Sequence, residues 1–122
     1  KKNFQITDEN IIDLNNRLDQ LIMLTKKLNA IPIFVTQKSL RSKLIDNKIY
    51  SIDEFDYMSK EKIISEIIIN NCEKNQIFCV DLFNKIKFSN DSLYDLVHAS
   101  PEGAKTIAKT IFADFDKILN KN

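Results

Sequence analysis

Asp95 and His98 are the residues of this chain whose types and spacing could do chemistry. An aspartate three residues before a histidine can accept the imidazole Nδ1 proton, which fixes the tautomer and turns Nε2 toward a nucleophile. Histidine suits this general-base role because its imidazole holds a lone pair at neutral pH. The pair therefore supplies two members of a hydrolytic triad, the base and the carboxylate that orients it. Taken alone, an Asp-x-x-His tetrad also arises by chance, in exposed turns without a catalytic role.

The other chemically capable side chains form no comparable constellation. The third member of a triad, an activated serine or cysteine, is not evident in the sequence. Cys72 and Cys79 do not form a C-x-x-C pair. We interpret them as buried free thiols at a helix end and in a strand, with a disulfide between them as the alternative. His98 is the only histidine, and one histidine with scattered acidic residues predicts no metal site.

Composition indicates one ordinary globular domain. The 122 residues are enough for a genuine hydrophobic core and too few to predict two domains. The formal net charge is +1, and lysines and acidic residues are interspersed. Charge therefore gives no argument for a nucleic-acid partner or an anionic membrane surface. The sequence shows no signal-peptide pattern and no apolar run of membrane-spanning length.

Periodic patterns predict the elements that must position Asp95 and His98. Apolar residues at helical spacing alternate along the chain with short runs that are apolar on both faces, as buried parallel strands are. Thr7 or Asp8 is a natural N-cap for the first helix, and Ser100 followed by Pro101 is a natural start for the last. In chain order we predict a helix over 8–29, a strand over 31–36, a helix over 59–72, a strand over 77–82 and a helix from 101 onward.

Residues 37–58 hold no sustained period. A loop of this length in a small domain is usually functional or mobile. An ordinary surface excursion with a short helix near residues 52–58 fits the same residues equally well.

The alternation of helices and strands predicts an α/β fold, with a parallel sheet and helices on both of its faces. Two strands are too few to cover two helix layers. We therefore expect a complementary N-terminal segment or a partner chain to complete the sheet. Thr36 and Gln37 end the first strand, at the edge where open α/β sheets bind ligands. They are candidate substrate-binding residues, with ordinary strand-end polarity as the competing interpretation.

The region around His98 resembles the closing block of the SGNH/GDSL hydrolase family. In that family an Asp-x-x-His motif precedes a small or polar residue, a Pro/Glu/Gly-type helix start and an amphipathic helix rich in Ala and Ile. Upstream, residues 31–37 and 78–82 look like the family's penultimate strand and the strand before its closing block. The residues that carry the match are Asp95, His98, Ser100, Pro101, Glu102, Gly103, Ile107 and Ala108.

This resemblance implies a three-layer, flavodoxin-like sheet, with residues 1–122 as the C-terminal portion of a single domain. It implies a serine hydrolase of acyl or carbohydrate esters, small-molecule substrates, that needs no metal or organic cofactor. Asp95 would orient His98, and His98 would be the general base. The family's Gly-Asp-Ser nucleophile block and its oxyanion glycine and asparagine are not found here, where Gly103 is the only glycine. The nucleophile is therefore expected from an N-terminal segment outside these residues. We expect surface or capping roles for Ser39, Ser42, Ser51, Ser59, Ser65, Ser89 and Ser92.

Two other function classes stay open beside the hydrolase. A non-catalytic α/β binding or assembly module could keep the fold without the nucleophile, and its open sheet edge would then need a partner chain. A Gly-Asp-Ser segment upstream would favour the enzyme, and its absence would favour the module. A flavodoxin-like nucleotide binder is disfavoured because the chain has no Gly-rich phosphate loop.

Overall fold

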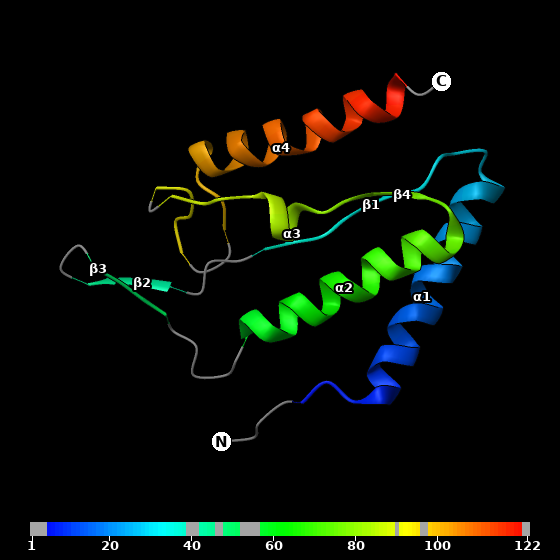
Figure 1. Cartoon of the computed structure of the whole chain (residues 1–122), viewed down its shortest axis with the longest axis horizontal. Helices are drawn as coiled ribbons and strands as arrows, with labels where there is room; N and C mark the ends of the chain where they lie inside the picture. The colour runs from blue at the N-terminus through cyan, green and yellow to red at the C-terminus, as the bar shows by residue number, and fades with distance from the viewer. Residues whose placement is uncertain are drawn as a thin grey trace.

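The computed structural model describes residues 5–38, 42–45, 48–51, 57–89, 91–95 and 98–120 (Figure 1). The predicted helices and strands occur in the predicted order, with two further strands and one short helix among them. The elements are α1 (Asp8–Lys27), β1 (Ile33–Val35), β2 (Ser42–Ile45), β3 (Lys48–Ser51), α2 (Tyr57–Asn75), β4 (Phe78–Val80), α3 (Leu82–Lys85) and α4 (Pro101–Leu119).

β1 and β4 form a two-stranded parallel sheet at the centre of the molecule. Ile33 lies opposite Phe78 and Val35 opposite Val80, and the Thr36 N–H extends the ladder by donating to the Val80 carbonyl at 3.0 Å. Figure 1 shows α4 on one side of these strands and α2 on the other, with α1 packed against α2. The fold is thus a mixture of helices and a small parallel sheet, as expected of an α/β domain.

An antiparallel hairpin occupies much of the segment for which the sequence gives no sustained period. β2 pairs with β3, with Ser42 opposite Ser51 and Ile45 opposite Lys48. The prediction of a loop over 37–58 is therefore wrong for residues 42–45 and 48–51. The short helix considered near 52–58 falls mostly on residues 52–56, which lie outside the described residues, and α2 begins at Tyr57.

Side-chain caps and left-handed residues fix the ends of the helices. Thr7 caps α1 in a reciprocal capping box with Asn10, and Ser100 caps α4 with Pro101 in its first turn, so both predicted starts are confirmed. α1 and α2 end at Asn29 (φ 57°) and Gln76 (φ 54°). Each of these residues lies within the paired 6→1 and 5→2 hydrogen bonds of a Schellman motif. Glycine usually occupies this position, and here asparagine and glutamine take it.

The core is formed by α1, α2, the strand pair and the α3 region. Its buried apolar residues are Leu18, Ile22, Ile67, Cys72, Val80, Leu82, Phe83 and Ile86.

Two apolar faces are less covered than the periodicity predicts. Ile63 and Ile64, expected on the inner face of the second helix, are 37% and 40% exposed, and only Ile67 of that stripe is buried. On α4, Phe112 is 70% exposed, while the residues buried on that helix are Gly103 and Asp114. The two-stranded sheet is too narrow to cover the apolar faces that these helices present.

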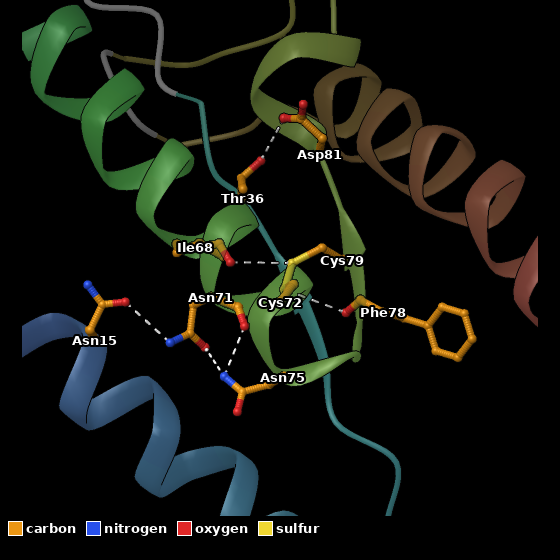
Figure 2. The surroundings of a disulfide bond; sticks show 9 residues. All are labelled: Asn15, Thr36, Ile68, Asn71, Cys72, Asn75, Phe78, Cys79 and Asp81. Carbon is orange, nitrogen blue, oxygen red and sulfur yellow. Dashed lines mark hydrogen bonds between the residues drawn. A yellow bond between two sulfur atoms is a disulfide. The ribbon is translucent and has the colours of Figure 1, made fainter.

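A disulfide joins Cys72 at the end of α2 to Cys79 in β4 (Figure 2). The preferred interpretation of these cysteines as free thiols is therefore wrong, and the alternative holds. The turn after α2 brings the two Cα atoms to 6.1 Å, within the range that a disulfide spans. The bond fixes α2 to the strand that leads toward Asp81. None of the described helices is both long and apolar enough to cross a bilayer.

Candidate functional site

Asp95 and His98 form the hydrogen-bonded pair that their spacing predicts. The imidazole Nδ1 lies 2.7 Å from Asp95 Oδ2, and the His98 backbone N–H donates to Oδ1 of the same carboxylate at 2.8 Å. Because an ionised carboxylate only accepts hydrogen bonds, the proton of the neutral ring lies on Nδ1. The lone pair is then on Nε2. Since the His98 side chain is 75% exposed, Nε2 is available to a reacting group.

A tight hairpin carries this pair. The Tyr94 N–H donates to the His98 carbonyl at 2.9 Å, and Leu93 and Ala99 form an antiparallel bridge. Asp95 and His98 therefore lie on the two arms of one chain reversal. This reversal explains how an i, i+3 spacing brings their side chains together.

The hairpin ends directly in α4. The Ser100 N–H donates to the Ser92 carbonyl at 2.9 Å, which closes the base of the hairpin. The Ser100 Oγ accepts from the Gly103 N–H at 3.1 Å and donates to the Asp91 carbonyl. The first turn of α4 and the hairpin thus share one residue, Ser100, which is 7% exposed.

Asp114 braces α4 against α3 on the far side of the same helix. Its carboxylate pairs with Lys85 of α3 and lies 3.5 Å from Lys117 Nζ. The hydrogen bond from Lys85 is the main cause that lowers the pKa of Asp114 from its ordinary value, against the opposing effect of burial. A buried carboxylate with two lysine partners keeps its charge, so this ion pair stabilises the helix that follows the candidate site.

Thr36 and Gln37, the predicted substrate-binding pair, lie in contrasting environments. Thr36 is fully buried, and its hydroxyl donates to Asp81 Oδ1 at 3.3 Å (Figure 2). The same hydroxyl accepts from the Phe83 N–H at 2.9 Å. Gln37 is exposed at the end of β1. The hydroxyl of Thr36 thus joins the end of β1 to the start of α3 and does not lead to His98.

Asp81 is a polar residue at this sheet edge that the sequence analysis missed. It caps α3 by accepting from the Asn84 N–H at 3.2 Å, and it borders a hollow of about 120 Å³ between α2 and α3. The missed signal is its place directly after the apolar run Phe78–Val80, within a predicted strand that extends to residue 82. The other residues that line the hollow are Lys62, Ser65, Glu66, Ile69, Asn70, Phe83 and Asn84.

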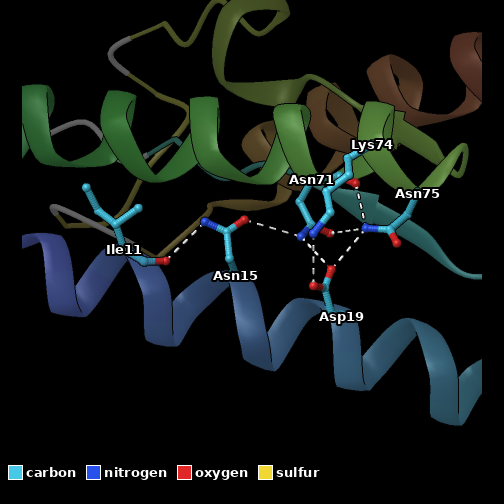
Figure 3. Close-up of polar contacts among 6 residues, drawn as sticks. All are labelled: Ile11, Asn15, Asp19, Asn71, Lys74 and Asn75. Atoms are coloured by element: carbon cyan, nitrogen blue, oxygen red, sulfur yellow. Dashed lines mark hydrogen bonds and ion pairs between the residues drawn. The ribbon is translucent and has the colours of Figure 1, made fainter.

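A second polar cluster joins α1 to α2 (Figure 3). Asp19 on α1 accepts from Asn71 Nδ2 at 2.9 Å, Asn75 Nδ2 at 3.0 Å and Lys74 Nζ at 3.2 Å. The side-chain hydrogen bonds from Asn71, Asn75 and Lys74, in that order, lower the pKa of Asp19 from its ordinary value. Asn71 is 1% exposed and also donates to Asn15 Oδ1 at 3.3 Å. The members hydrogen-bond to one another and so hold the two helices together, and Asp19 and Asn75 also border an open hollow of about 500 Å³.

The described residues contain no group of three or more histidine, cysteine, aspartate or glutamate side chains that could hold a metal ion. No family model matches this chain, and no curated protein or solved structure is detectably similar to it. The exposed Asp95–His98 pair is therefore the arrangement from which a function can be argued.

Proposed function

We propose that this chain is the C-terminal part of a serine ester hydrolase of the SGNH/GDSL type. The observation that carries the proposal is the Asp95 carboxylate 2.7 Å from His98 Nδ1, with the side chain of His98 exposed. This geometry suits a general base whose tautomer is fixed by its neighbour. Burial of the ring among apolar residues, or its use as a cap, would leave no lone pair for a substrate.

In the proposed reaction His98 Nε2 takes the proton of a serine hydroxyl as its oxygen attacks the acyl carbon of an ester. The tetrahedral intermediate collapses, and the C–O bond to the leaving alcohol breaks as His98 returns the proton to that alcohol. Water then attacks the acyl-enzyme, with His98 again as base, and releases the acid and the serine. Asp95 holds the ring and stabilises the imidazolium in each step. No metal or organic cofactor takes part.

The serine is proposed to come from a segment outside these 122 residues, which would also extend the sheet into a three-layer fold. Two observations support this. Among the described strands β1 pairs only with β4. The three apolar residues of β1 are only partly buried, so they leave apolar surface that a further strand could cover. A row of large apolar side chains also remains exposed along α1 and in the turn that leads to β1, at Leu21, Leu24, Leu28 and Ile31. Added strands would cover such residues, since exposed apolar patches of this kind mark interfaces.

In this proposal Gln37 is the substrate-contacting residue of the β1 end, because it is exposed and follows the strand directly. Thr36 does not contact the substrate in this proposal and instead supports the strand end that carries Gln37. Its hydrogen bonds to Asp81 and Phe83 fix the end of β1.

The test is a fluorophosphonate probe on the full-length protein purified from its natural source, with the adduct located by mass spectrometry. We expect one serine upstream of these residues to be labelled. His98→Ala should abolish both the labelling and esterase turnover while the circular dichroism spectrum stays that of the native protein, because the exposed ring supports little packing.

An adduct that persists in His98→Ala would remove His98 from the mechanism. A folded full-length protein that takes up no probe would overturn the hydrolase and favour the non-catalytic assembly module, whose open β1 edge pairs with another chain.

A further inference from the structure

We propose that three serines and the single glycine form a positioning device for the Asp95–His98 pair. Ser89, Ser92 and Ser100, called here the serine clamp, close the base of the hairpin, and Gly103 allows α4 to dock against it. The catalytic meaning of the device rests on the function proposed above, whereas its effect on the geometry of His98 does not.

The need for such a device follows from the exposure of His98. Its side chain is 75% exposed, and among the described residues its hydrogen-bond partner is Asp95, which is itself 54% exposed. Most of the imidazole surface is therefore in contact with solvent. The position of Nε2 therefore depends on the backbone of the hairpin that carries both residues.

The serine clamp fixes that backbone from beneath. The Ser92 Oγ accepts from the Ser89 N–H at 2.8 Å and lies 3.0 Å from the Ser89 Oγ. The Ser92 N–H donates back to the Ser89 carbonyl at 3.0 Å. Ser92 is 2% exposed, while Ser89 lies at the surface, so the Ser92 groups are the ones for which loss of a hydrogen bond is costly.

Gly103 joins the clamp to α4 by its lack of a side chain. The Ser92 carbonyl accepts the Ser100 N–H at 2.9 Å and at the same time lies directly against the Gly103 Cα. A Cβ at position 103 would overlap that carbonyl oxygen, and the obstacle is backbone that cannot rotate away. Since φ of Gly103 is not positive, the glycine serves close approach and not an unusual backbone conformation.

Any side chain at position 103 must therefore push the Ser92 carbonyl off α4. That movement opens the hydrogen bond from Ser100 and changes the angle at which the hairpin presents His98. The sole glycine of the sequence thus stands eight residues after Asp95, where the base of the hairpin meets the first turn of α4.

The experiment follows the two ring nitrogens of His98 by long-range ¹H–¹⁵N correlation NMR in the full-length protein, assigned by comparison with His98→Ala. We expect the native protein to show protonated Nδ1 and unprotonated Nε2. Gly103→Ala should shift the ring toward the mixed tautomers of an unconstrained imidazole, and kcat should fall about 100-fold with KM unchanged, as misplacement of a catalytic group by about 1 Å does.

Ser92→Ala tests the clamp without inserting an atom, so it decides the matter if Gly103→Ala does not fold. It should disturb the His98 tautomer in the same direction but less. Ser100→Thr, which keeps the capping hydroxyl, should retain more of the native tautomer than Ser100→Ala. Thr106→Ala is the matched control, because it removes an α4 hydroxyl bonded to the Glu102 carbonyl, outside the clamp.

Native His98 nitrogen signals in folded Gly103→Ala and Ser92→Ala would overturn the proposal. If the native enzyme proves to have no esterase activity, the tautomer comparison among these variants still tests the positioning device. The two proposals can therefore fail separately.

Discussion

Asp19 and Asp95 are two aspartates that each bind several donors, and their surroundings differ completely. Asp19 accepts from two asparagines and a lysine that project from α2. Asp95 accepts from both the ring and the backbone N–H of His98. The Asp19 cluster is centred on Asn71, which is 1% exposed. In the Asp95–His98 pair the imidazole is 75% exposed.

The difference teaches how to separate a structural carboxylate from a catalytic one. The partners of Asp19 are two amides and an ammonium, which act here as hydrogen-bond donors and hold α2 to α1. The partner of Asp95 is an imidazole, whose ring nitrogens can both give and take a proton. Disruption of the first cluster should therefore change stability, and disruption of the second should change turnover.

Asp95→Asn gives the largest expected effect and tests whether the Asp95–His98 pair is catalytic. The amide oxygen still accepts the His98 backbone N–H, but its NH₂ group faces Nδ1 and favours the wrong tautomer. We expect kcat to fall about 10⁴-fold, with the thermal midpoint within a few degrees of native. Asp91→Asn, the same change four residues earlier, should retain native turnover. Equal turnover in the two variants would mean that Asp95 has no special role.

Asn71→Ala tests whether the Asp19 cluster acts on stability alone. The side chain is buried, and its removal takes the described donor from Asn15 Oδ1 and one of three donors from Asp19. We expect the free energy of unfolding to drop by about 1–3 kcal/mol in urea titration, with kcat per folded molecule unchanged. Asn70→Ala, at the exposed neighbouring position, should change stability by less than about 0.5 kcal/mol. A loss of kcat in Asn71→Ala would show that the two clusters are coupled.

The dependence of folding stability on acid pH gives the smallest expected effect, and it tests the structural role of Asp19. Hydrogen bonds from Asn71 and Asn75 lower the pKa of Asp19, and that from Lys85 lowers the pKa of Asp114. A lowered folded-state pKa contributes stability that is present above the ordinary value of 3.8 and is lost as pH falls through the lower value. Asp19→Asn should therefore flatten the acid limb of the stability curve below about pH 4. An acid limb as steep as that of the native protein would contradict this role.

The sequence predicts the local part of this molecule well. Asp95 and His98 are three residues apart, and Thr7 and Ser100 cap their helices through residues three positions away. Spacings this short are governed by backbone geometry, which is why periodicity and cap residues suffice. The parallel strands are also recovered, because runs that are apolar on both faces are characteristic of buried strands.

The features that sequence analysis misses depend on contacts between distant residues or on weak turn signals. Asp19 contacts Asn71 across a separation of 52 positions in the sequence. No pattern in either helix predicts that these two residues meet. The hairpin of β2 and β3 lacks a glycine turn signal, since the pair between its strands is Asp46-Asn47. The exposure of Ile63 depends on how much sheet is available to cover α2, which a helical period alone does not report.

The Cys72–Cys79 disulfide has a consequence for how the chain behaves when it is cut. Lys74 lies between the two cysteines, and its side chain is 66% exposed. A trypsin cut after Lys74 divides the chain into a piece with α1 and most of α2 and a piece that carries Asp95 and His98. The two pieces remain one covalent molecule and come apart on a denaturing gel only after a reductant is added.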